Sequence, residues 1–167
     1  MNTAIVQGSL GAIAQQNKTS IAESFINANA IIIVDTSGSM DQSDARNGKT
    51  RYQVACDELA NLQKTLPGKL ALLSFSNDVV FCPNGIPFQF SGMTDLAKAL
   101  KFAKVADLPS GMRFIIISDG EPDDEKEALK VAKTFKNRID TIFVGREGAE
   151  GQDFLNRLAK ASGGEHV

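Results

Sequence analysis

The sequence predicts a single α/β domain with a mainly parallel β-sheet and helices on both faces. Short strand-like segments alternate along the chain with longer helical segments. Residues 31–34 and 114–117 are continuously apolar rather than alternating, which is typical of strands that are buried on both faces. With 167 residues, of which 43% are hydrophobic, the chain is long enough to bury one core.

The N-terminal part predicts a partly flexible lead over residues 1–18 and a helix over residues 19–28. Ser20 and Glu23 have the spacing of a capping box, and Ile21, Phe25 and Ile26 give the helix an apolar face. No Lys or Arg precedes Lys18, unlike the basic start of a secretory signal, so we expect a cytoplasmic protein. The first strand is expected at residues 30–34.

The middle of the chain predicts a helix followed by a β-hairpin. Val54, Leu59 and Leu62 have helical spacing, and the helix over residues 51–65 is expected to end before the Pro-Gly pair that follows. Strands at 69–75 and 79–81 are separated by a Ser-Asn-Asp turn. A turn this short predicts one antiparallel strand at the edge of the sheet.

The C-terminal half repeats the alternation. We expect a helix at 95–103, a buried strand at 113–117, a helix at 123–136, a strand at 139–144 and a helix at 151–161. The last residues, SGGEHV, are expected to begin one more short strand. The acidic residues from Asp119 to Glu127 are interpreted as a solvated helix start rather than a second metal site.

Composition excludes several classes of function. The net charge of -2 and the absence of a basic stripe argue against binding nucleic acid. No segment approaches the roughly 20 apolar residues that span a bilayer, so we expect no membrane contact. Cys56 and Cys82 lack metal-type spacing and are expected to be reduced and largely buried. His166 is expected to be a solvated side chain.

Three oxygen-bearing side chains follow the first predicted strand. Asp35, Ser37 and Ser39 occupy alternate positions, so in extended backbone they project the same way. Gly38 allows a tight turn between the two serines. Hard oxygen ligands suit Mg²⁺, Mn²⁺ or Ca²⁺ and retain Zn²⁺ or Cu²⁺ poorly. The segment therefore predicts a cation-binding loop.

Two further residues are expected to join this loop. Asp119 follows the second continuously apolar strand, and Thr94 opens a predicted helix in the sequence SGMTDL. Ligands of open parallel sheets bind beyond the carboxyl ends of the strands, where the strand order reverses. If the strands that end at Val34 and Ile117 are neighbours, these loops supply two carboxylates and three hydroxyls.

On these motifs the chain resembles a von Willebrand factor A domain with a metal-ion-dependent adhesion site, of the small type common in microbes. The family's Asp-x-Ser-x-Ser motif matches DTSGS at residues 35–39. The threonine of its second loop matches Thr94, and the aspartate of its third loop matches Asp119 in IIISDGEP. The segments RYQVACDEL and DFLNRLAKASGG also resemble family helices, so the likeness extends from about residue 30 to the end.

The resemblance implies a Rossmann-like three-layer sandwich that holds Mg²⁺ or Mn²⁺, with Ca²⁺ a weaker candidate. It implies that Ser37, Ser39 and Thr94 are metal ligands and that Asp35 and Asp119 bind directly or through water. It further implies that an Asp or Glu of a partner protein completes the coordination. The sequence also has no evident nucleophile, general base or phosphate-binding loop, so we do not expect an enzyme. Family members of this kind also work in larger assemblies, often beside an ATPase.

Other readings remain open at this point. Asp35 and Asp119 could have a purely structural role, because aspartates are common at strand ends and in turns. Thr94 would suit a helix cap. A Mg²⁺-dependent phosphoester hydrolase would use similar ligands, although a second carboxylate would be expected where Ser37 stands. A scaffold subunit with a purely structural metal is the third reading. Phe81, Phe88 and Phe90 are expected either to pack under the site loop or to form an exposed contact patch near the metal.

One departure from the family concerns its C-terminal helix, whose displacement reports metal occupancy in many members. This chain ends at Val167, soon after the last predicted helix. We therefore expect the helix at 19–28 to pack in the place of the missing one, so that deletion of residues 1–28 lowers stability. We also expect a constitutively competent site rather than large affinity switching.

Overall fold

The computed structural model describes residues 28–66, 68–87, 92–108 and 111–167. Five strands form one sheet in the order β3-β2-β1-β4-β5. Their bounds are Ala30–Asp35 (β1), Leu70–Phe75 (β2), Val79–Phe81 (β3), Arg113–Ser118 (β4) and Ile139–Phe143 (β5). Neighbouring strands are parallel except β3, which pairs with β2 antiparallel. The predicted mainly parallel sheet with one antiparallel edge strand is confirmed.

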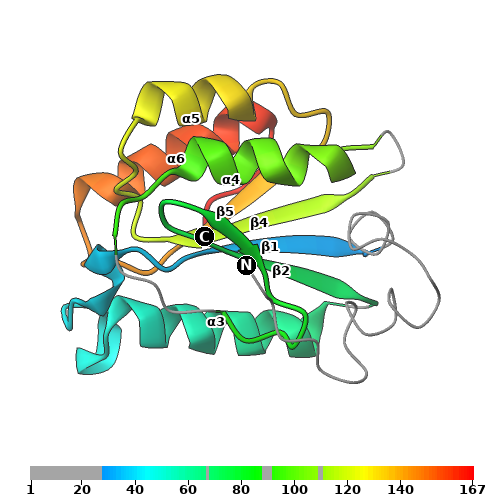
Figure 1. Cartoon of the computed structure of the whole chain (residues 1–167). Coiled ribbons are helices and arrows are strands. Elements are labelled where there is room, and N and C mark those ends of the chain that lie inside the picture. The colour runs from blue at the N-terminus through cyan, green and yellow to red at the C-terminus, as the bar shows by residue number, and fades with distance from the viewer. Residues whose placement is uncertain (1–27, 67, 88–91, 109–110) are drawn as a thin grey trace.

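Helices cover both faces of this sheet (Figure 1). Helix α3 (Arg51–Thr65) lies on one face, and α4 (Leu96–Ala103), α5 (Glu125–Ala132) and α6 (Glu150–Ser162) lie on the other. Short 3-10 turns are formed by Gly38–Asp41, Arg46–Gly48 and Lys104–Ala106. The result is the predicted three-layer sandwich.

Within the described residues, no helix is long and apolar enough to cross a bilayer.

Two hydrophobic cores arise because alternate side chains of a strand point to opposite faces of the sheet. Ile31 and Ile33 of β1 join the core under α4, α5 and α6, together with Phe114 and Phe154. Ile32 and Val34 join the core under α3, which includes Leu59. β1 is buried along its whole length, so its end is a rigid support for the loop that follows.

Several side chains predicted from the sequence have clear outcomes. Cys56 and Cys82 are free thiols, with Cys82 buried and Cys56 half-buried. Phe81 is buried in the core under α4, α5 and α6. Phe88, Phe90, the lead at 1–18 and all but the last residue of the predicted helix at 19–28 lie outside the described residues.

Three predictions about the C-terminal half were wrong. Helix α5 ends at Ala132 rather than at residue 136, because the chain then turns and the backbone N–H groups of Lys136 and Asn137 donate to the Asp107 carboxylate. His166 is half-buried rather than freely solvated, and its Nδ1 lies 2.8 Å from Thr141 Oγ1. The last residues form a single parallel bridge between His166 and Thr141, not a strand.

Asp107 fixes the connection between α5 and β5. Its carboxylate accepts hydrogen bonds from Lys136 N, Asn137 N and Asn137 Nδ2 at 2.6 to 2.9 Å. Although burial raises its pKa, these donors lower it below the ordinary value of 3.8. The charged carboxylate therefore stabilises the fold above that pH, and the contribution is lost as the pH falls through the lowered pKa.

Asp107→Asn should lower the free energy of unfolding by about 2 kcal/mol at pH 7, because an amide offers fewer acceptors to these donors. The measurement is urea denaturation from pH 7 down to pH 2. We expect the difference between variant and wild type to shrink as the pH falls below about 4, the ordinary range of an Asp carboxyl. A difference that stays constant with pH would contradict this account.

Candidate metal centre

The strand order brings the two predicted carboxylates to one edge of the sheet. β1 and β4 are parallel neighbours with Val34 paired to Ile117, so Asp35 at the end of β1 and Asp119 just after β4 emerge side by side. After β1 the chain passes to β2 and β3 on one side, then returns to β4 on the other side. This reversal of strand order is the place where open α/β sheets bind ligands.

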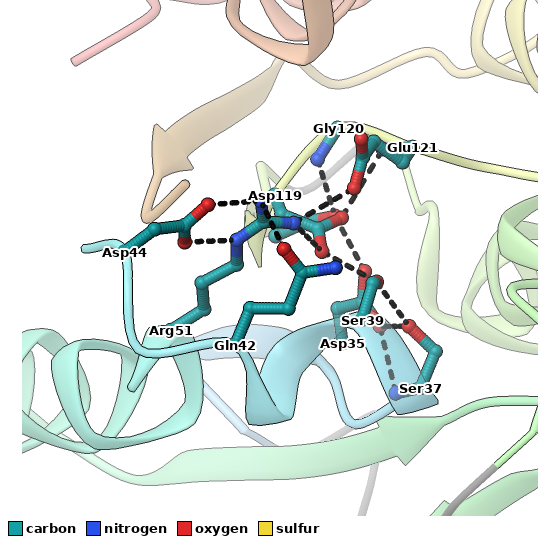
Figure 2. A network of polar contacts seen from close by, with 10 residues as sticks. Asp35, Ser37, Ser39, Gln42, Asp44, Arg51, Asp119, Gly120 and Glu121 are labelled. Carbon is teal, nitrogen blue, oxygen red and sulfur yellow. Dashed lines mark hydrogen bonds and ion pairs between the residues drawn. The ribbon is translucent and has the colours of Figure 1, made fainter. Parts of the chain in front are cut away.

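Four of the five predicted residues lie along one chain of hydrogen bonds and hydroxyl contacts (Figure 2). Asp35 Oδ1 accepts from the backbone N–H of Ser37 at 2.9 Å and from its hydroxyl at 2.6 Å. The Ser37 and Ser39 hydroxyl oxygens are 3.2 Å apart. Ser39 Oγ in turn donates to Asp119 Oδ2 at 2.6 Å. The first and third loops are therefore joined by side chains.

Thr94 lies on the second loop, which is bonded to both of the others through backbone. Gly38 N donates to Gly92 O at 3.1 Å. The backbone of Thr94 donates to the Asp123 carboxylate at 3.0 Å and accepts from Asp123 N at 2.9 Å. Its side chain is buried, but it is not a member of the hydrogen-bonded chain above. The reading of Thr94 as a helix cap is wrong, since Asp95 caps α4.

Asp35 is buried beside a second negative charge. Burial and the charge of Asp119 raise its pKa to about 7, against the opposing effect of its hydrogen bonds from Ser37 and Ser118. Two carboxylates in one buried site repel each other, and an added cation relieves that repulsion. The electrostatics of the site therefore favour a cation.

The structure adds two residues that the sequence did not single out. Ser118 donates its hydroxyl to Asp35 Oδ2 at 2.8 Å and accepts from Gly120 N at 3.0 Å. Arg51, at the start of α3, is buried and donates from Nη1 to Asp119 Oδ2 at 3.0 Å. A basic residue in the first turn of a helix opposes the helix dipole. That unfavourable position was the available signal that Arg51 has a carboxylate partner elsewhere.

The hydroxyl groups are arranged as metal ligands need to be. Each serine has its shortest contact to a carboxylate, so its hydrogen points to Asp35 or Asp119 and its lone pairs remain available. Octahedral Mg²⁺ has bonds of about 2.1 Å, which places adjacent ligand oxygens about 3.0 Å apart. The 3.2 Å separation of the Ser37 and Ser39 oxygens is close to that value. The donor set fits a small divalent cation.

This fit depends on hydroxyl oxygens. Within the ranges that the structure describes, no three His, Cys, Asp or Glu side chains form a group that could hold a metal ion. The acidic residues after Asp119 have other partners: Asp124 caps α5, and Glu127 pairs with Lys101 at 3.2 Å. A metal at this edge of the sheet would therefore use serine and threonine as well as carboxylates.

Comparisons with known proteins find relatives in structure and none in sequence. No protein-family model matches the chain, and no curated protein matches it. Among solved structures, an aerotolerance-related membrane protein from Bacteroides fragilis is 18% identical, with a TM-score of 0.67, over 83% of this chain and 89% of its own. BatB from Bacteroides thetaiotaomicron is 19% identical, with a TM-score of 0.57, over 83% and 88% respectively.

A third similar structure is the manganese-loaded TRAP protein from Plasmodium vivax. It is 19% identical, with a TM-score of 0.57, over 81% of this chain and 63% of its own. At such low identity these likenesses show the fold alone. Together with the strand order and the two helical layers, they show that this chain has a von Willebrand factor A-like α/β sandwich fold.

Proposed function

We propose that this chain is a protein-binding module in which a Mg²⁺ or Mn²⁺ ion bridges to an acidic side chain of a partner protein. The ion would be held by Asp35, Ser37, Ser39, Thr94 and Asp119. The observation that carries the proposal is the orientation of the serine hydroxyls, which point their hydrogens at the two carboxylates and leave their lone pairs for the ion.

The neutral hydroxyls explain why such an ion would attract a partner. A hydroxyl ligand binds the cation without cancelling its charge, so a coordinated ion still attracts a further anionic ligand. If all the ligands from this chain were carboxylates, they would neutralise the ion, and that attraction would be lost. A carboxylate from another protein is the ligand that this incomplete set favours.

Asp35 is poorly placed to act as the nucleophile of a phosphoester hydrolase. Its Oδ1 accepts two hydrogen bonds from Ser37, and its Oδ2 accepts one from Ser118. Both oxygens are thus engaged, and each hydrogen bond lowers the electron density that an attack requires. This observation supports binding over hydrolysis.

The surface beside Thr94 suits a protein partner. Met93 is 57% exposed directly before Thr94, and exposed methionines are enriched where proteins adapt to partners. A groove of about 490 Å³ begins next to them and is lined by Asp95, Lys98, Asp123 and Asp124 from the starts of α4 and α5, among others.

The test is affinity capture from an extract of the source cells with the protein as bait. The capture is run with Mg²⁺, with EDTA, and with the Asp35→Ala variant in Mg²⁺. Asp153→Ala is the matched control, because Asp153 is an exposed carboxylate on α6 outside the site. Retained proteins are identified by mass spectrometry.

We expect at least one partner that requires Mg²⁺, binds the wild type and Asp153→Ala, and is lost with Asp35→Ala. Re-expression of that partner with its acidic residues changed to amides would then identify the bridging carboxylate. Partners that bind equally in EDTA and to Asp35→Ala would contradict the proposed function.

A further inference from the structure

We infer that Arg51 sets the net charge of the metal site when the ion is bound. Its positive charge lowers the affinity of the site for the ion. The same charge leaves the loaded site with a net positive charge that attracts a partner carboxylate. This inference rests on the proposed function and names a residue outside the five ligands. It makes Arg51 a positioning and charge-setting residue, because its guanidinium contacts Asp119 and is not among the groups proposed to hold the ion.

The first support is the burial of Arg51 at the site. Only 5% of the residue is exposed, although it lies at the first position of a helix. Its Nη1 donates to Asp119 Oδ2 at 3.0 Å, the same oxygen that accepts from Ser39 Oγ at 2.6 Å. The arginine and the proposed ligand Ser39 therefore meet on one carboxylate oxygen (Figure 2).

The second support is the way in which the guanidinium is fixed. Its Nε and Nη2 both donate to Asp44 at 2.8 Å, a bidentate pair that lowers the pKa of Asp44. Nη1 also donates to Glu121 at 2.8 Å, and Nη2 to Gln42 at 3.3 Å. Because the planar guanidinium is hydrogen-bonded to several side chains at once, it stays beside Asp119 whether or not an ion is bound.

The third support is the balance of buried charge. Asp35 and Asp119 are both buried, and once both are ionised they carry two negative charges, which a divalent ion alone would cancel. The buried guanidinium adds one positive charge, and Asp44 and Glu121, which partly offset it, are more exposed. With Arg51 present, the buried core of the loaded site is positive; without it, that core is neutral.

This balance has opposite consequences for the two ligands. Even with screening like that of water, a guanidinium and a divalent cation about 6 Å apart repel enough to weaken the binding constant about tenfold. The same positive charge attracts an incoming carboxylate. Arg51 therefore lowers the affinity of the site for the ion and raises its affinity for the partner's carboxylate.

The test uses Mn²⁺ alone as the probe, with free Mn²⁺ measured by electron paramagnetic resonance and folding followed by thermal melting of the ion-free protein. Arg51→Gln removes the charge and keeps a donor for Asp119. Arg51→Lys keeps the charge and loses the fork. Glu121→Gln, at a side chain that is 51% exposed, removes a negative charge next to the guanidinium with little risk to folding.

We expect Arg51→Gln to bind Mn²⁺ about tenfold more tightly than the wild type. Arg51→Lys should stay within about twofold of the wild type despite a lower melting temperature, and Glu121→Gln should bind about two- to threefold more weakly. A merely structural arginine predicts instead that Arg51→Gln and Arg51→Lys both weaken Mn²⁺ binding.

Weaker or unchanged binding by Arg51→Gln would overturn the inference. If Arg51→Gln does not fold, the Mn²⁺ affinity of Glu121→Gln becomes the test. Unchanged or tighter Mn²⁺ binding by Glu121→Gln would overturn the inference. In both cases the wild type still binds Mn²⁺. A wild type that binds no Mn²⁺ is a different result, because it contradicts the proposed function itself.

Discussion

Asp35→Asn should abolish metal binding while the domain remains folded. The wild-type carboxylate is buried, orients Ser37 through two hydrogen bonds, and faces the charge of Asp119, which together with burial raises its pKa to about 7. The amide keeps the shape and removes the charge that an ion would need. Since changes of residues that only orient metal ligands weaken metal affinity by about 10- to 100-fold, we expect a loss of about 100-fold or more here.

Thermal melting of the ion-free protein distinguishes this loss from unfolding. Removal of one of two repelling buried charges should offset much of the hydrogen bonding that an amide loses toward Ser37 and Ser118, so the melting temperature should fall by no more than a few degrees. Isothermal titration with Mn²⁺ supplies the affinity, with Asp153→Asn on the exposed face of α6 as the control for a carboxylate change outside the site. Retained Mn²⁺ affinity in Asp35→Asn would show that Asp35 is a structural residue only.

Gly120→Ala should be strongly destabilising, by about 3 kcal/mol or more, since left-handed backbone and forced overpacking each cost about 1 to 3 kcal/mol. Gly120 follows Asp119 directly and has a φ of 73°. A Cβ there would lie 2.0 Å from the carbonyl oxygen of Gly151 in α6. That contact is with backbone, so the first turn of α6 would have to move away from the Asp119 loop.

Gly148→Ala is the matched control for this change. Gly148 has a similar φ of 78°, but a Cβ there would have no atom within 4 Å. We expect this variant to lose only about 1 kcal/mol, which is a few degrees in melting temperature for a domain of this size. Similar melting temperatures for the two variants would show that contact between Gly120 and Gly151 does not limit the position of Asp119.

The parts of the fold that could be predicted are those that short-range patterns determine. The continuously apolar runs identified β1 and β4, and their neighbouring positions in the sheet follow from the strand order that a doubly wound fold imposes. The alternate spacing of Asp35, Ser37 and Ser39 placed three polar oxygens beyond a strand end, and the structure joins them to Asp119 through hydrogen bonds.

The parts that were missed depend on contacts between distant segments. Arg51 is 68 residues from Asp119 in the sequence, and its unfavourable place in the first turn of a helix indicates a carboxylate partner without identifying which one. The early end of α5 has the same origin, because the donors at Lys136 and Asn137 are captured by Asp107 on another connection. Local propensity favours a longer helix there, and the tertiary hydrogen bonds outweigh it.

The measurement that tests the central claim most directly is a crystal structure of the protein grown with Mn²⁺, with anomalous scattering used to locate the ion. We expect one anomalous peak bonded to the hydroxyl oxygens of Ser37, Ser39 and Thr94, with a coordination position facing outward that holds water or a carboxylate from another molecule. A peak at a different place, no peak at saturating Mn²⁺, or an ion fully enclosed by this chain's own side chains would contradict the account.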